Sequence, residues 1–291
     1  MTATPQTQRG IANAPRYLRL LSDIHVDVNP PHSVRFDRLP TDEESLLVLA
    51  GDFGTPKKLA DWLRIVAEPF PYVVAVLGNH DYWGMSIERA PEKWREALAK
   101  HLSEDLLARF TLLEQEILDI GTLRIIGTTL WSDYQGADPY ALRAAQEMMR
   151  DHKHIRTRGG TARFSVRDAF ELHQSSLQWL DAAIGAPWSG SKLVVTHHAP
   201  SRESIYPAFR KDDLSGAYAS CLDDFVAHSG DVGVHLWLHG HTHHAVDYHI
   251  GAVRVLSNAY GYPNEGTGVI LDQAIALHSF SGQAAFLAPV G

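Results

Sequence analysis

Five short apolar segments of this chain each run directly into residues whose side chains can bind a metal ion. The segments are residues 17–22, 46–50, 72–77, 193–196 and 234–238. The residues that follow them are Asp23 and His25, then Asp52, then Asn79, His80 and Asp81, then His197 and His198, and finally His241 and His243. Apolar runs of this length are typical of buried strands. Because ligands bind beyond the carboxyl ends of the strands in open α/β sheets, we expect these side chains to meet at one edge.

The rest of the chain predicts an α/β protein. Helical periodicity in residues 56–67 and 88–101 alternates with the first three strands, which is typical of βαβ units and a largely parallel sheet. Further strands are expected at 111–118, 122–127, 128–132 and 245–256, and further helices at 139–152, 167–184 and within 214–228. We therefore predict one domain over residues 16–291, with two packed sheets and outer helices, after a flexible tail at residues 1–15.

Composition narrows the possible partners and metal ligands. The formal net charge is -8, whereas a nucleic-acid-binding protein usually has a basic balance, so nucleic acid is disfavoured as a partner. The chain has no apolar stretch of about 20 residues and no apolar signal segment, so we expect a cytoplasmic protein without a membrane span. Cys221 is the single cysteine, so a metal would be held by His, Asp and Asn, which suit Mn, Fe, Zn, Co or Ni.

The spacing within these motifs fits a metal site. In Asp23-Ile24-His25 the two polar side chains point the same way from an extended segment, because side chains alternate with period two. Gly51, Gly78 and Gly240 precede ligand candidates and permit tight turns. Taken singly, each Asp or His is a common turn residue or helix cap, and the run 239–244 is compatible with a surface tract. Five coincidences at strand ends make the metal site the better hypothesis.

The ordered set DxH, GD, GNHD, HH and GHTH closely resembles the calcineurin-like metallophosphoesterases. That superfamily includes purple acid phosphatases, protein phosphatases, phosphodiesterases and Mre11-type nucleases. The resemblance implies a four-layer α/β/β/α sandwich with two mixed sheets and the metal site at the C-terminal ends of the strands. It also implies ligands for a first metal ion (Asp23, His25 and His243), for a second (Asn79, His197 and His241) and a bridge between them (Asp52). The pattern favours His197 over His198 as the ligand, and His198 would then lie behind the ligands or face the substrate.

The resemblance implies hydrolysis of a small-molecule phosphodiester or phosphomonoester by a metal-bridging hydroxide. His80 matches the motif histidine that contacts substrate, and we expect it to donate a proton or a hydrogen bond to the leaving oxygen. Asp81 follows it directly and is expected to orient its ring or raise its pKa. The alternatives are an Mre11-type nuclease, which the acidic balance disfavours, and a non-catalytic scaffold, which the complete ligand set disfavours. The oligomeric state is left open.

Substrate contacts are a separate hypothesis. Residues 143–167 carry seven Lys or Arg and two acidic residues, within a helical insertion expected around 136–167. This segment is either a solvated helix and loop or a lid that guides an anionic substrate with Arg156, Arg158 and Arg163. Tyr82 and Trp83 either wall the substrate pocket or belong to the core.

Overall fold

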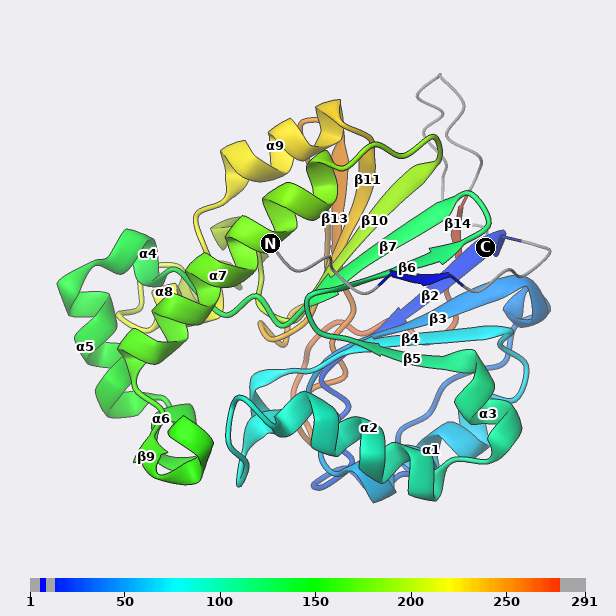
Figure 1. Cartoon of the computed structure of the whole chain (residues 1–291), viewed down its shortest axis with the longest axis horizontal. Helices are drawn as coiled ribbons and strands as arrows, with labels where there is room; N and C mark the ends of the chain where they lie inside the picture. Colours follow the sequence, from blue (N-terminus) through cyan, green and yellow to red (C-terminus); the bar gives the residue numbers. More distant parts are fainter. Residues whose placement is uncertain (1–5, 9–13, 278–291) are drawn as a thin grey trace.

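Two β-sheets lie face to face in the computed structural model, which describes residues 6–8 and 14–277 (Figure 1). The five-stranded sheet has the order β14 (Ile275–Ala276), β2 (Tyr17–Leu21), β3 (Ser45–Ala50), β4 (Tyr72–Val76) and β5 (Phe110–Leu113). The seven-stranded sheet has the order β1 (Gln6–Gln8), β6 (Glu116–Ile120), β7 (Leu123–Thr128), β10 (Ser191–Thr196), β11 (Val234–His239), β13 (Val253–Ser257) and β12 (Val246–Ile250). Strands β2 to β5 are parallel to one another, as are β7, β10, β11 and β13.

Alternation of apolar side chains along the strands explains why the sheets stack. Leu46, Val48 and Ala50 of β3 point into the apolar layer between the two sheets, where Ile125 of β7 and Val195 of β10 meet them. The intervening residues of β3 point outward instead, toward the helices. Both faces of each sheet are therefore covered, which is how parallel strands are normally buried.

Helices form the two outer layers. The helices α1 (Pro56–Val66), α2 (Ala90–His101) and α3 (Glu104–Arg109) lie on the side of the five-stranded sheet, where Trp62 and Trp94 are fully buried (Figure 1). The helices α7 (Val166–Gly185) and α9 (Asp223–Asp231) cover the seven-stranded sheet through residues such as Leu180 and Val226. The predicted four-layer α/β/β/α sandwich with two mixed sheets is confirmed.

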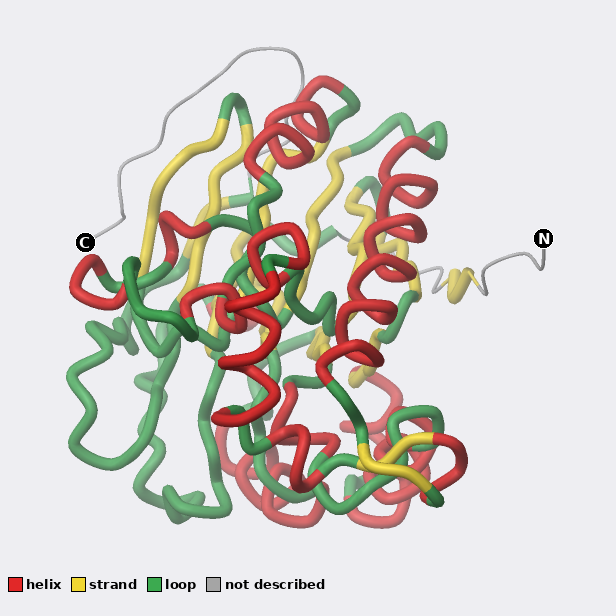
Figure 2. Tube along the Cα trace, turned by 90° about the vertical axis from the view of Figure 1, so that its left-hand side faces the viewer, coloured by secondary structure: helices red, strands yellow, loops and turns green. Residues whose placement is uncertain are grey.

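A cluster of short elements lies beside the sheets rather than on them (Figures 1 and 2). Its members are α4 (Tyr134–Ala137), α5 (Pro139–Met148), α6 (Asp151–His154), β8 (Arg156–Thr157), β9 (Ala162–Arg163) and α8 (Ser215–Tyr218). The chain also makes 3₁₀ turns at Asp42–Glu44, Asn79–Tyr82, Arg158–Gly160, Arg202–Ser204 and Pro207–Phe209. The predicted helical insertion around residues 136–167 falls largely in this cluster.

Several predicted elements have different limits in the structure. The expected strand at 111–118 is two strands, β5 and β6, separated by a turn in which Gln115 has a φ of 50°. The strand expected at 128–132 does not form over residues 129–132, because Leu130 and Trp131 take positive φ values of 72° and 59°. The helix expected within 214–228 is divided into α8 and α9.

The described residues include part of the predicted N-terminal tail. Residues 6–8 form strand β1, which pairs with β6, whereas the remainder of the predicted flexible tail up to residue 13 lies outside the described residues. No helix in the described part of the chain combines the length and the apolar character that crossing a membrane requires.

Candidate metal centre

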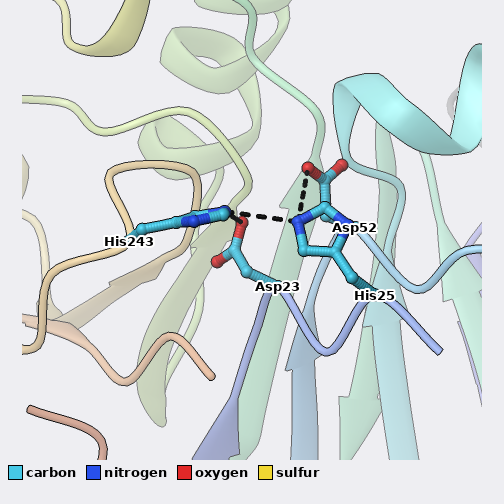
Figure 3. A group of neighbouring side chains, drawn as sticks. All are labelled: Asp23, His25, Asp52 and His243. Carbon is cyan, nitrogen blue, oxygen red and sulfur yellow. Dashed lines mark hydrogen bonds and ion pairs between the residues drawn. The ribbon is translucent and has the colours of Figure 1, made fainter. Parts of the chain in front are cut away.

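Two groups of acidic and histidine side chains lie at the carboxyl ends of the strands, and they share one residue. The first group is Asp23, His25, Asp52 and His243, and the second is Asp52, His197 and His241. Within each group the potential ligand atoms all lie within 4.8 Å of one another. Figure 3 shows the first group converging from three separate loops. The sequence prediction that these strand ends meet in space is therefore confirmed.

Asp52 stands between the two groups. Its Oδ2 lies 3.7 Å from His25 Nε2, and its Oδ1 lies 3.4 Å from His197 Nε2. One carboxylate thus presents a different oxygen to each group. The backbone N–H of His80 donates to Oδ1 over 2.9 Å and helps to fix the orientation of the carboxylate.

Contacts on the far side of three of the histidine rings turn one nitrogen of each toward the cluster. The Nδ1 atom of His197 lies 2.8 Å from the carbonyl oxygen of Ala50, so this nitrogen carries the proton and Nε2 keeps its lone pair. His243 Nδ1 is held in the same way by Glu265 Oε2 at 2.7 Å. In His241 the two ring nitrogens exchange these roles, because its Nε2 lies 3.3 Å from Ala217 O and Nδ1 is left toward the cluster. Such outer contacts are typical of metal-binding histidines.

Asn79 joins the second group through its amide oxygen. Its Nδ2 donates to Asp151 Oδ1 over 2.9 Å. This bond turns the Asn79 Oδ1 atom toward His197, where it lies 3.0 Å from His197 Nε2. The seven predicted metal ligands are thus brought together in one place.

The charge balance of this cluster suits cations. Burial and the neighbouring carboxylates of Asp81 and Asp23 raise the pKa of Asp52 well above its usual value. Burial lowers the pKa of His25 to about 3, so this ring is neutral at pH 7. His243 behaves differently, because hydrogen bonds to Asp23 and Glu265 outweigh its burial and raise its pKa to about 10. Buried carboxylates and neutral imidazoles facing one space form a donor set that fits metal ions.

A cavity of about 550 Å³ opens over these groups. His80 lines it, with its ring stacked on Trp83 at 3.8 Å between centroids and its Nε2 3.4 Å from the Tyr262 hydroxyl. Burial lowers the pKa of His80 to about 4, so the ring is neutral at pH 7. An anionic phosphate bound beside it would raise that pKa.

Comparison with known proteins identifies the family. A sequence model of the calcineurin-like phosphoesterases matches residues 17–245, which include all seven ligand candidates. The chain belongs to this family. Membership and the Asp and His groups together make it a metal-dependent phosphoester hydrolase.

Two further proteins resemble this calcineurin-like phosphoesterase along most of its length. An uncharacterised protein of Acanthamoeba polyphaga mimivirus is 21% identical over 271 residues, which cover 86% of this chain and 92% of the viral protein. The crystal structure of phosphopantetheinyl hydrolase from Mycobacterium tuberculosis aligns with a TM-score of 0.65 and 17% identity, covering 87% of this chain and 92% of that one. The structural likeness supports the fold.

Asp81 does not play its expected part in this phosphoesterase. Its carboxylate accepts hydrogen bonds from the backbone N–H groups of Asp52, Phe53, Gly54 and Gly78. No hydrogen bond among the described residues joins it to the His80 ring. The residue therefore fixes the loop that carries Asp52, and the predicted orientation of His80 by Asp81 is corrected. Burial raises the pKa of Asp81 to about 7, although the four N–H donors oppose that rise.

Two of the proposed substrate contacts are buried instead. Tyr82 is 2% exposed, and its hydroxyl bonds to Glu114 and Thr129, so it is a core residue. His198 is also 2% exposed, with its ring packed 4.2 Å from that of His241 and its Nδ1 near Thr129 O. His198 therefore lies behind the ligand candidates, which was one of the two positions considered for it.

The arginines of the insertion do not reach the cavity either. Arg156 lies in β8 and Arg158 in the following 3₁₀ turn, where the backbone N–H of Arg158 bonds to Glu88. Neither residue lines the cavity, and nor does Arg163. Within the basic segment 143–167, it is Met149 that lines the cavity. The expected arginine contacts with substrate are thus not supported by the geometry.

Sequence reasoning missed the residues that hold the ligands in place. Asp151 accepts hydrogen bonds from Asn79 and Trp83 at a single oxygen, over 2.9 and 2.7 Å. Glu265 holds His243, and Tyr262 stacks on His25 with ring centroids 4.5 Å apart. The sequence offered no signal for these contacts, because each one comes from a distant segment with no motif of its own.

Proposed function

We propose that this chain hydrolyses small phosphodiesters, and phosphomonoesters more slowly, with two metal ions bound by the seven clustered residues. The observation that carries the proposal is the position of Asp52, which presents one oxygen to each group. The ligands of the first ion would be Asp23, His25 and His243. Those of the second would be Asn79, His197 and His241, with Asp52 shared.

When bound, the two metal ions would neutralise phosphoryl oxygens and lower the pKa of a water molecule. In the overall reaction, the oxygen of water forms a new bond to phosphorus and the bond from phosphorus to the leaving alcohol breaks. Of the two hydrogens of that water molecule, one is transferred as a proton to the leaving oxygen, which is released as the alcohol. No covalent intermediate with the protein is required.

In the proposed mechanism His80 delivers that proton. Its Nε2 faces the cavity beside the Tyr262 hydroxyl, and its ring is held flat against Trp83. A neutral imidazole in this position donates a hydrogen bond to the leaving oxygen, and phosphate binding moves its pKa toward the range that supports proton transfer.

The cavity favours diesters over monoesters. Among the described residues, no Lys or Arg lines it, whereas Asp212 and Glu265 do. A monoester carries a second negative charge that would then be balanced by the metal ions alone. A diester, with one charge and two organic groups, fits the lining better. The same lack of cations argues against a nuclease that grips a nucleic-acid backbone.

A matched assay tests this proposal. Metal-free protein is loaded in turn with Mn, Fe, Zn and Co and assayed with p-nitrophenyl phosphate and bis-p-nitrophenyl phosphate, with metal content measured in parallel. We expect two metal ions per chain and a higher kcat/KM for the diester. A phosphopantetheinyl ester belongs in the same panel, because the fold neighbour is by its name a phosphopantetheinyl hydrolase. One metal ion at saturation, or no ester hydrolysed with any metal, would overturn the proposal.

A further inference from the structure

A row of apolar side chains lies on one wall of the cavity, in residues 205–214, which we call the 205–214 segment. Ile205, Tyr206, Phe209 and Leu214 all line the cavity from this segment. Tyr206 is 51% exposed and Phe209 is 61% exposed. Large aromatic side chains gathered at the mouth of a pocket are a feature of ligand-binding surfaces.

The fold does not need these aromatic rings for its own packing. Polar contacts hold the segment in place, since Arg210 donates from Nε to Ile205 O over 3.0 Å and from Nη2 to Glu203 O over 2.8 Å. Arg202 Nη2 donates to Ser215 Oγ over 3.1 Å, and Ile205 is buried against Ala199 and Ala219. The segment is therefore anchored at both ends, while Tyr206 and Phe209 remain available to a ligand.

The charge of the cavity indicates what kind of ligand would bind there. No Lys or Arg among the described residues lines the cavity. Arg210 and Lys211 belong to the segment but are not part of that lining, and Arg210 pairs with Glu203 at 3.2 Å. Asp212 lies in the segment itself and lines the cavity. An anionic group would meet Asp212 and gain no Lys or Arg partner from the lining, whereas a neutral apolar group would bury area against Phe209 and Leu214.

The position of His80 indicates which part of the substrate would face the segment. The aromatic neighbours of His80 in the described chain are His25, Trp83 and Tyr262. Tyr206 instead contacts His244, with ring centroids 5.1 Å apart. Because the proposed function puts the leaving group at His80, we expect the other ester group to be the one that extends toward the segment.

We propose that the 205–214 segment is a subsite for the non-leaving organic group of a phosphodiester, and that it selects a neutral, apolar and preferably aromatic group. This inference rests on the proposed phosphodiesterase function. It adds a binding site that the metal centre alone does not define, in a segment outside the ring contacts of His80.

Three diesters with one leaving group provide the test. Methyl, phenyl and 4-carboxyphenyl p-nitrophenyl phosphate release the same p-nitrophenolate, so differences in kcat/KM report on the second group. We expect kcat/KM for the phenyl diester to exceed that for the methyl diester by about tenfold or more. The 4-carboxyphenyl diester should fall well below the phenyl diester. Equal values for methyl and phenyl, or a preference for the carboxylate, would overturn the subsite.

Variants locate the effect. Phe209→Ala and Tyr206→Ala should each lower the phenyl-to-methyl ratio severalfold, and neither side chain is buried, so folding should be maintained. Tyr140→Ala is the control, because Tyr140 is 84% exposed on α5 and does not line the cavity. A ratio unchanged in both segment variants, or lowered equally in the control, would contradict the assignment.

A binding measurement separates failure of the subsite from failure of the proposed function. Phenylphosphonate and methylphosphonate are titrated into manganese-loaded protein by calorimetry, which needs no turnover. Tighter binding of phenylphosphonate by about tenfold, lost in Phe209→Ala, would support the subsite even if no diester were hydrolysed. Equal dissociation constants in wild-type protein would reject the subsite even if diesters were hydrolysed.

Discussion

At the scale of single residues, the metal centre depends on unusual backbone conformations and on room for close approach. Positive φ values occur at Asp23 (53°), Asp52 (59°) and His241 (69°), a conformation that costs a non-glycine residue about 1 kcal/mol or more. Each of these three residues is a ligand candidate just beyond the end of a strand. The hydrogen bonds around the ligands hold these conformations in place, so the strain is part of how the centre is built.

Gly78 provides space rather than conformational freedom. A Cβ atom at this position would lie 2.1 Å from Asp52 Oδ1 and 2.4 Å from the Asp52 backbone nitrogen. We therefore expect Gly78→Ala to displace Asp52, to lower stability by about 1–3 kcal/mol and to reduce metal content. Urea unfolding and metal analysis would measure these effects. The control is Gly185→Ala, where nothing lies within 4 Å of the added carbon. Full metal content in the Gly78 variant would refute this account.

His80 should matter for turnover and not for metal binding. Its backbone N–H contacts Asp52, but its ring faces the cavity and is not one of the clustered ligand candidates. We expect His80→Ala to lower kcat by ~10²–10⁴-fold while both metal ions stay bound. Steady-state kinetics and metal analysis on the same sample would check this, with exposed His228→Ala as the control. A variant with full kcat would remove His80 from the mechanism.

At the scale of elements, the short helix α6 supports the metal centre from outside the sheets. Its first residue, Asp151, is 3% exposed and uses one oxygen to hold both Asn79 and Trp83. Asn79 is a ligand candidate, and Trp83 stacks on His80. The insertion therefore acts on the site through one acidic residue, rather than through the arginines around it.

Two substitutions at Asp151 should show whether it acts through its hydrogen bonds to Asn79 and Trp83 or through its negative charge. Asp151→Asn keeps an oxygen that can accept both hydrogen bonds, so metal affinity should change little. Asp151→Ala removes the acceptor and should weaken binding of the second metal ion by ~10–100-fold. Competition titrations with a chelator would measure both constants. Asp168→Ala is the control, since Asp168 caps α7 through Ser165 and should affect stability alone. Equal metal affinity in the Ala and Asn variants would contradict the prediction.

Glu88 attaches the turn after β8 to the segment before α2 and should make this attachment sensitive to pH. It accepts hydrogen bonds from Thr157 Oγ1 (2.9 Å) and from the Arg158 backbone N–H (2.6 Å). Partial burial alone would raise the pKa of Glu88. These hydrogen bonds and one from Ser86 outweigh it and lower the pKa of Glu88 to about 2. The folded value lies below the usual 4.5, so the stabilisation is present above pH 4.5 and is lost as the pH falls toward 2.

The variant Glu88→Gln tests this pH dependence. Between pH 5 and pH 3 the urea midpoint of wild-type protein should fall more than that of the variant, because only the wild type has this carboxylate to protonate. Glu96→Gln, an exposed position on α2, is the control and should follow the wild type. Parallel pH profiles for wild type and Glu88→Gln would rule out the contribution.

Local patterns explain which elements and site residues the sequence predicts. The ligand candidates follow apolar strands directly. Because the carboxyl ends of parallel strands meet at one edge of a sheet, the sequence predicts that these side chains lie together. The role of Asp81 was misjudged because residues 79–82 form a 3₁₀ turn, in which successive side chains point about 120° apart. Asp81 therefore points away from the ring of His80. Asp151 and Glu265 were missed because their positions depend on how distant loops pack.

At the scale of the whole molecule, the candidate metal centre lies between the two sheets at their carboxyl ends. Asp23, Asp52 and Asn79 follow β2, β3 and β4 of the five-stranded sheet. The ligand candidates His197, His241 and His243 follow β10 and β11 of the seven-stranded sheet. The apolar layer between the sheets holds them face to face, but at this edge the contacts are between charged and polar groups. Metal ions bound there would cross-link the layers.

Removal of metal should therefore destabilise the fold as a whole. Without cations, the buried carboxylate of Asp52 is poorly compensated, as its raised pKa indicates. A ligand present at 100 times its Kd contributes about 2.7 kcal/mol to stability. At about 2–4 °C per kcal/mol for a large domain, chelation should lower Tm by several degrees, and added metal should restore it. Calorimetry of metal-free and manganese-loaded protein would measure both transitions. Asp52→Ala should lose most of the response, because the shared carboxylate is gone. If loaded and metal-free wild-type protein melted at the same temperature, the centre would not be joining the two sheets.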